Sequence, residues 1–173
     1  MEKYVPDMYQ KSIYEINYKK LYNRGLKCLL FDLDNTLVPY NIDEPNEKII
    51  SLFKDLKKIG FKVIIFSNSG KKRLKKFKDI LEVDCCARAM KPCIKKFQKV
   101  LDEYNYNINE VAIIGDQLLT DIKGGNNIGI TTIFINPVSK KDFFFTKFSR
   151  MIERRIIKRL SKKDVFYRGK YYE

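Results

Sequence analysis

The feature that most constrains the fold is an alternation of short apolar runs with longer amphipathic segments. The apolar runs have the length of buried strands, whereas the amphipathic segments repeat their apolar residues with helical spacing. Such alternation predicts an α/β fold, with a three-layer, Rossmann-like arrangement of crossover helices on a mainly parallel sheet of five strands. The predicted strands are residues 26–33, 61–66, 83–89, 111–114 and 131–135, and the main helices residues 46–59, 70–81 and 93–104.

The composition changes at residue 138. The chain has 35 Lys and Arg against 21 Asp and Glu, a formal charge of +14. Residues 138–173 hold 12 of these basic residues and 4 of the acidic ones, interleaved with phenylalanines. We therefore expect a core of residues 1–137 and a basic, aromatic, helical C-terminal extension of residues 138–173. The extension either belongs to the same domain or faces a membrane or a partner.

The absence of histidine narrows the chemistry. Among the 173 residues there is none, which removes Ser-His-Asp triads, Cys-His pairs and His-ligated zinc. The four cysteines form no C-x-x-C pair, as expected of reduced thiols. No stretch resembles a signal peptide or approaches the ~20 apolar residues of a membrane span. These features predict a cytoplasmic protein whose catalysis would use carboxylates, lysine, hydroxyls or a metal.

Polar residues follow three of the predicted strands. Ligands of open α/β sheets bind beyond the carboxyl ends of the strands, so these side chains should converge in one crevice. Carboxylate oxygens suit Mg²⁺, and a lysine and a hydroxyl can neutralise and hold a phosphate. The residues concerned are Asp32, Asp34, Ser67, Asn68 and Asp116, with Lys91 before the third helix. The set predicts phosphoryl transfer.

Without histidine, the most economical nucleophile is a carboxylate that forms an aspartyl phosphate. We assign this role to Asp32, the first acid after the strand. Asp34 would protonate the leaving oxygen and then activate water. The alternative is that these acids only cap the turn and the following helix. The combination of motifs at successive strand ends favours the catalytic interpretation.

The motifs resemble those of the haloacid dehalogenase (HAD) superfamily. D-x-D-N-T at residues 32–36, Ser67-Asn68, Lys91 and G-D-x4-D at residues 115–121 match its four motifs in order. Within it, the chain resembles the YqeG-type, class III, capless phosphatases, which are similar to the mitochondrial phosphatidylglycerophosphatase family. This narrower resemblance covers roughly residues 5–160, including F-x4-R-M-x-E-R-R in the extension.

The resemblance implies a role for each matching position. Asp32 would be nucleophile and Mg²⁺ ligand, and Asp34 acid and base with its backbone carbonyl on the metal. Asp116 would be a further metal ligand, with Asp121 supporting the metal shell or Lys91. The phosphate-binding residues would be Thr36, Ser67, Asn68 and Lys91.

The spacing of the motifs bears on the substrate. Residues 35–66 and 69–90 leave room for one helix each with a turn or a short strand, and neither interval holds a cap domain. An uncovered site suits a phosphate that protrudes from a macromolecule or a membrane, unless a neighbouring subunit of an oligomer serves as lid. By resemblance, the phosphomonoester would be phosphatidylglycerophosphate at the inner face of a membrane. The alternatives are a protein, nucleic-acid or nucleotide phosphate, or a basic module that binds RNA or a partner without catalysis.

Read as a helix, the extension has an apolar stripe flanked by basic residues. This pattern is typical of an interfacial membrane helix, predicted for residues 143–163, but equally of a helix that packs on the sheet or on another subunit. Nucleic-acid binding is disfavoured. The stripe comprises Phe144, Phe148, Met151 or Ile152, Ile156 and Leu160. Two further features are interpreted as structural: residues 71–73 as solvated basic surface, and Gly124-Gly125 as a turn.

Overall fold

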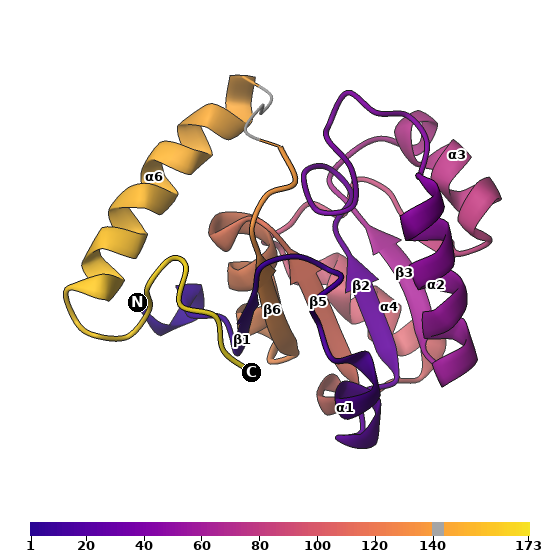
Figure 1. Ribbon diagram of the computed structural model, residues 1–173, viewed down its shortest axis with the longest axis horizontal. Helices are drawn as coiled ribbons and strands as arrows, with labels where there is room; N and C mark the ends of the chain where they lie inside the picture. Colours follow the sequence, from indigo (N-terminus) through magenta and orange to yellow (C-terminus); the bar gives the residue numbers. More distant parts are fainter. Residues whose placement is uncertain (140–143) are drawn as a thin grey trace.

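Six parallel strands form one sheet in the order β1-β6-β5-β2-β3-β4 (Figure 1). This computed structural model describes residues 1–139 and 144–173, and of residues 144–147 the backbone alone. The strands are β1 (Met8–Gln10), β2 (Cys28–Phe31), β3 (Lys62–Phe66), β4 (Asp84–Cys86), β5 (Val111–Gly115) and β6 (Thr131–Ile135). The α-helices are α1 (Tyr18–Asn23), α2 (Glu47–Ile59), α3 (Lys71–Leu81), α4 (Lys95–Tyr104), α5 (Lys123–Ile128) and α6 (Phe144–Ser161). The described residues also form three short helical turns, η1 (Glu2–Tyr4), η2 (Ile108–Glu110) and the π-helical η3 (Leu118–Ile122).

The α/β prediction is confirmed, with one strand more than expected. Five strands lie where the apolar runs placed them, and every pairing between the six named strands is parallel. The additional strand, β1, is three residues long and pairs with β6 at the edge of the sheet. Its sequence, Met-Tyr-Gln, is too short to show a period, which is why the sequence pattern missed it.

The helix boundaries depend on local capping. α2 begins after Asn46, whose side chain accepts a hydrogen bond from the Ile49 N–H at 3.0 Å. It ends at Gly60, whose φ of +112° is the left-handed conformation that glycine adopts most readily. α4 begins at Lys95, two residues later than predicted, because Pro92 lies in a turn that carries Lys91 into the sheet edge. The predicted start of this helix at residue 93 is therefore wrong.

The interpretation of Gly124-Gly125 as a turn is also wrong, because both residues lie in α5. The absence of side chains there allows close helix packing. A Cβ at Gly124 would overlap Phe97 of α4, and one at Gly125 would overlap Thr132 of β6 and Ile113 of β5. A glycine pair in a helix is unfavourable by propensity but permits this approach to the sheet.

Helices cover both faces of the sheet, so the central strands are apolar on both sides. Leu29 and Phe31 of β2 pack toward α1, α2 and α3, whereas Cys28 and Leu30 of the same strand pack toward α4. This alternation explains why residues 26–33 read as a continuous apolar run. The layers of helix, sheet and helix are those of the predicted Rossmann-like fold.

The order of the strands places a crevice at the centre of the sheet. From β2 the chain proceeds outward through β3 and β4, and then returns to the other side of β2 as β5. Such a reversal of strand order is where ligands bind in open α/β sheets. The two intervals expected to lack a cap lie wholly within the described residues. The first contains a loop, α2 and β3, the second α3 and β4, so the prediction of a capless fold is confirmed.

α6 packs on the outer end of the sheet, beside β1, β6 and η3. Ile156 and Leu160 are buried together with Tyr9, Phe134 and Phe166. By contrast, Phe148 and Met151 expose 64% and 43% of their surface. The apolar stripe predicted for the extension is therefore divided between packing and exposure. Phe143 lies outside the described residues, and the side chains of Phe144, Phe145 and Lys147 are not described.

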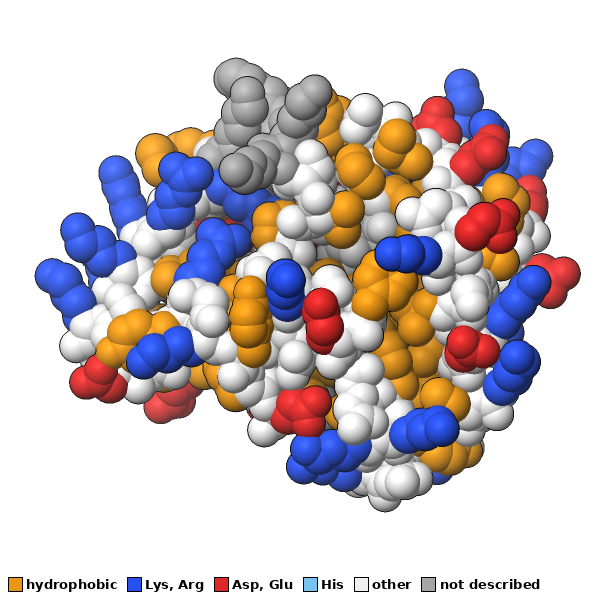
Figure 2. All heavy atoms as spheres, viewed as in Figure 1, with side chains coloured by type: hydrophobic (Ala, Val, Ile, Leu, Met, Phe, Trp, Pro, Cys, Tyr) orange, Lys and Arg blue, Asp and Glu red, His pale blue; other side chains and the backbone are white. Residues whose placement is uncertain are grey.

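Basic side chains gather along the outer surface of α6, at the left of Figure 2. The exposed residues of this basic face are Arg154, Arg155, Lys158 and Arg159 of α6, together with Lys162 and Lys163 directly after it. Within the described part of the chain, no helix has the length and apolar character needed to cross a membrane.

Candidate active site

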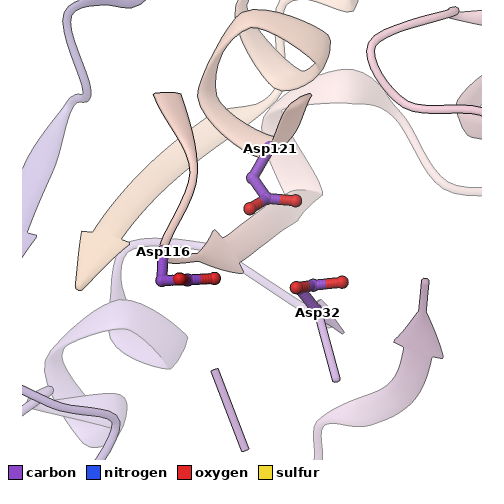
Figure 3. Close-up of side chains that lie close together, drawn as sticks. All are labelled: Asp32, Asp116 and Asp121. Atoms are coloured by element: carbon purple, nitrogen blue, oxygen red, sulfur yellow. The ribbon is translucent and has the colours of Figure 1, made fainter. Parts of the chain in front are cut away.

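Three buried aspartates converge beyond the ends of β2 and β5. Asp32 directly follows β2, Asp116 directly follows β5, and Asp121 comes from η3. One carboxylate oxygen from each lies within 4.8 Å of the others. Figure 3 shows the three side chains directed toward one shared space. Convergence follows from topology, because β2 and β5 are hydrogen-bonded neighbours with their carboxyl ends at the same edge.

The approach of Asp121 requires the glycine before Asp116. A Cβ on Gly115 would overlap the Asp121 carboxyl group. That carboxyl group accepts a hydrogen bond from the Gln117 N–H at 3.1 Å. The π-helical turn η3 brings Asp121 back over the end of β5, and such turns are frequent at functional sites. The G-D-x4-D spacing is thus the sequence signature of this fold-back.

Lys91 is the central cation of the site. Its Nζ donates to Asp32 Oδ1 at 2.6 Å, to Asp121 Oδ1 at 2.7 Å and to the Phe66 carbonyl at 2.9 Å. Only 2% of the side chain is exposed. Asn68 holds the Lys91 backbone from both sides, since its Oδ1 accepts from the Lys91 N–H and its Nδ2 donates to the Lys91 carbonyl. These three acceptors match the three ammonium protons of Lys91, so a phosphoryl oxygen would have to replace one of them.

Burial is the largest single influence on the pKa values of the charged residues in the site. It raises the pKa of Asp32 to about 7, against the opposing effect of Lys91 and with a further increase from Asp121. It raises the pKa of Asp116 to about 6, against the opposing effect of Arg150. The pKa of Asp121 is raised for the same reason. Burial lowers the pKa of Lys91, but Asp121 and Asp32 outweigh it and raise the pKa above its ordinary value.

Asp34 faces α3 rather than the three converging aspartates. Its Oδ2 accepts from the Ser69 hydroxyl at 2.5 Å, and its Oδ1 accepts from Arg73 Nη2 at 2.9 Å and Nε at 3.2 Å. Arg73 also donates to the backbone carbonyls of Pro39 and Ile42 in the loop after β2. The interpretation of residues 71–73 as solvated surface is therefore wrong for Arg73, whose side chain is only 16% exposed.

The remaining predicted phosphate-binding residues lie around the same edge. Ser67 is buried at the end of β3, and its hydroxyl oxygen accepts from the Ser69 N–H at 3.2 Å. Thr36 is also buried, and its hydroxyl donates to Asp116 Oδ1 at 3.1 Å. Thr36 thus contacts a carboxylate, and Asn68 the backbone of Lys91. In this structure Thr36 and Asn68 therefore hold two other site residues, Asp116 and Lys91, in place.

Arg150 of α6 reaches the site from the C-terminal extension. Its guanidinium contacts both the carboxylate and the backbone carbonyl of Asp116. Glu153 accepts from Arg150 Nη1 at 3.1 Å and from the Leu119 N–H at 3.1 Å. Sequence reasoning missed these residues. Their only local signal is a basic and an acidic residue one helical turn apart within the R-M-x-E motif.

The three aspartates fit a divalent cation. When ionised, they are acceptor-only oxygen ligands from three segments, and these three carboxylates face two cationic side chains, Lys91 and Arg150. Hard oxygen ligands with room for water and phosphate suit Mg²⁺ rather than a thiophilic metal. Asp32, Asp116 and Asp121 are the carboxylates placed to hold such an ion.

A protein-family model matches most of the chain, over residues 1–139, and is described as mitochondrial PGP phosphatase. The match spans well over half of the chain and includes β2, β5 and all four motifs. The chain belongs to the mitochondrial PGP phosphatase family.

Curated relatives of this PGP phosphatase family member are also named as phosphatases. The chain is 38% identical over 160 residues to the probable phosphatase YqeG of Bacillus subtilis, covering 92% of this chain and 93% of that one. It is 27% identical over 173 residues to phosphatidylglycerophosphate phosphatase 1, chloroplastic/mitochondrial, of Arabidopsis thaliana. That alignment covers 93% of this chain but only 49% of the plant protein.

Solved structures support the HAD fold of this PGP phosphatase family member. The cobalt-bound deoxy-D-mannose-octulosonate 8-phosphate phosphatase of Haemophilus influenzae has a TM-score of 0.53 at 15% identity, over 78% of this chain and 90% of that one. A haloacid dehalogenase-like hydrolase of Streptococcus pneumoniae has a TM-score of 0.53 at 14% identity, over 64% and 84%. The protein is a phosphatase with a HAD-type fold.

Proposed function

We propose that this phosphatase hydrolyses a phosphomonoester through an aspartyl phosphate on Asp32, with Mg²⁺ as cofactor. The observation that supports this most directly is the position of Asp32, which is buried, follows the central strand and shares its space with Asp116, Asp121 and Lys91. A carboxylate removed from water and flanked by a cation and metal-ligand oxygens is equipped for in-line attack on phosphorus.

Each chemical step is assigned to a side chain. Asp32 attacks phosphorus with one carboxylate oxygen, the ester oxygen leaves, and Asp34 supplies its proton. Asp34 then takes a proton from the water that attacks the aspartyl phosphate, which releases phosphate and regenerates Asp32. Lys91 and Ser67 hold phosphoryl oxygens, whereas Asn68 and Thr36 fix Lys91 and Asp116. Bound Mg²⁺ would neutralise phosphoryl charge and orient the group, held by Asp32, Asp116 and the Asp34 carbonyl, with Asp121 beside them.

The substrate that we propose is phosphatidylglycerophosphate. The family match and the name of the Arabidopsis relative support this choice. The capless site leaves room for a phosphate that projects from a surface. Exposed Phe148 and Met151, close along α6 to its basic face, fit an anionic membrane at the inner leaflet. Residues 138–173 would then serve as a membrane-facing extension of the core of residues 1–137.

Phosphate release separates this proposal from its alternatives. Wild type and Asp32→Asn are compared with Mg²⁺ on mixed micelles of phosphatidylglycerophosphate and on p-nitrophenyl phosphate. We expect turnover of the lipid that Asp32→Asn abolishes while circular dichroism stays unchanged. Turnover of the small ester alone would keep the mechanism and favour a protein, nucleic-acid or nucleotide phosphate. Activity of the Asp32→Asn variant close to that of wild type would remove Asp32 as nucleophile.

A further inference from the structure

The C-terminal helix contributes two charged residues to the edge of the metal site. Arg150 lies on α6, outside the residues 1–139 that the family model matches. Its side chain is 11% exposed, and the Asp116 side chain that it contacts is fully buried. An ion pair so placed is not an ordinary surface contact, since both charges have lost most of their water.

The geometry of the contact is specific to arginine. One guanidinium nitrogen, Nη2, contacts the Asp116 carboxylate, and the other, Nη1, donates to the Asp116 backbone carbonyl. A planar guanidinium that holds both the side chain and the main chain of Asp116 restricts the rotamer of Asp116. The Thr36 hydroxyl donates to the other carboxylate oxygen of Asp116. Asp116 is thus oriented by two partners that lie outside the cluster of three aspartates.

Glu153 fixes the arginine in turn. Its two carboxylate oxygens accept separately from Arg150 Nη1 and from the Leu119 N–H of η3, and only 4% of the side chain is exposed. Ile156 and Leu160 anchor the following turns of α6 in the core. The pair therefore joins α6 to the segment between Asp116 and Asp121.

We propose that Arg150 is a positioning residue that holds Asp116 in the orientation required for the divalent cation, and that Glu153 locks Arg150 in place. This inference rests on the cation role proposed above for Asp116. It makes α6 a part of the active site and not only a surface helix. Replacing a residue that orients a metal ligand through a hydrogen bond typically changes metal affinity by roughly 10- to 100-fold.

The test measures Mg²⁺ binding directly, by titration calorimetry on the full chain and by the rise in unfolding temperature that Mg²⁺ produces. The variants are Arg150→Ala, Arg150→Lys and Glu153→Gln. The matched control is Arg154→Ala, which removes the same charge from the exposed face of the same helix. We expect Arg150→Ala to weaken Mg²⁺ binding at least about tenfold, and the lysine variant to recover part of the loss, because one ammonium cannot fork.

The unfolding temperature of each variant without metal shows whether the variant loses Mg²⁺ affinity because Asp116 is misplaced or because the fold is destabilised. If Arg150→Ala proves too unstable to titrate, Arg150→Lys and Glu153→Gln carry the test. Unchanged Mg²⁺ affinity in variants that fold would overturn the inference while leaving the proposed function intact. Tighter Mg²⁺ binding would also overturn it, since the guanidinium would then compete with the cation. A wild type that binds no Mg²⁺ would overturn the cation role itself.

Discussion

Lys91 and Asp32 form a buried ion pair, with 2.6 Å between Nζ and Oδ1 and less than a tenth of either side chain exposed. The two residues are 59 positions apart in the chain. Lys91 also binds Asp121, so one cation holds two of the three carboxylates at the proposed metal site. The pair links the stability of the fold to the arrangement of the site, because removal of Lys91 would leave two anions buried without their cation.

Replacement of Lys91 by methionine should destabilise the metal-free protein. Breaking a buried ion pair by removing one partner typically costs about 3–5 kcal/mol, and phosphatase activity should disappear as well. Urea unfolding measures the first effect and phosphate release the second. Lys99→Met, on the exposed face of α4, is the control and should change neither. A free energy of unfolding equal to that of wild type would contradict the structural role of Lys91.

Replacement of Gly115 by alanine should displace Asp121, because the new Cβ would occupy the space of its carboxyl group. Overpacking of this kind typically costs about 1–3 kcal/mol. Mg²⁺ affinity should fall with it, which titration calorimetry would record. Gly70→Ala is the comparison, since no atom lies within 4 Å of its added Cβ. If both substitutions had equal small effects, the close approach of Asp121 to Gly115 would be refuted.

Replacement of Arg73 by alanine should lower kcat by roughly tenfold or more, because Asp34, the acid–base group that we propose, would lose its near-attack geometry. Arg73 is the residue that joins Asp34 to the loop carbonyls of Pro39 and Ile42. Steady-state kinetics on p-nitrophenyl phosphate measure the effect. Lys72→Ala, exposed at the neighbouring position, should retain wild-type kcat. Equal kcat values for both variants would show that Arg73 does not position Asp34.

The metal-free protein should lose stability as the pH rises from about 4 to about 7. The pKa values of Asp32 and Asp116 are raised in the folded state to about 7 and about 6, from an ordinary 3.8. The folded state therefore binds more protons than the unfolded state in this interval, so the contribution is complete at low pH and is lost as the carboxyls ionise.

Thermal unfolding with EDTA across this range, compared between wild type and Asp32→Asn, isolates the contribution of Asp32. The stabilisation by Mg²⁺ should grow over the same interval, since metal ligands must be deprotonated. A stability difference between the two proteins that does not change with pH would contradict the raised pKa.

Substitution of Phe148 and Met151 by serine should weaken binding to vesicles of phosphatidylglycerol by about tenfold, because exposed apolar side chains drive interfacial insertion. Turnover of p-nitrophenyl phosphate should not change. Co-sedimentation measures the binding. Ile108→Ser removes a comparably exposed apolar side chain before β5 and should have no effect. Vesicle binding that is insensitive to the double substitution would argue against this surface as the membrane contact.

The pattern of residues along the chain was enough to establish the fold class and the edge of the sheet at which the acids meet. Burial imposes a local period, so strands covered on both faces appear as apolar runs and their covering helices as amphipathic segments. Asp32 and Asp116 follow two such runs, and parallel strands bring their ends to one edge. β1 escaped prediction because three residues at an edge carry no such period.

The partners that hold the acids became clear only in three dimensions. Arg73 and Asp34 are 39 residues apart, and Arg150 and Asp116 are 34 apart. A charged side chain has the same local pattern whether it is solvated or buried in an ion pair, so the sequence assigned Arg73 to the surface and left Arg150 without a role. The division of the α6 stripe into buried Ile156 and exposed Phe148 has the same cause, because the helical period marks a face but not what covers it.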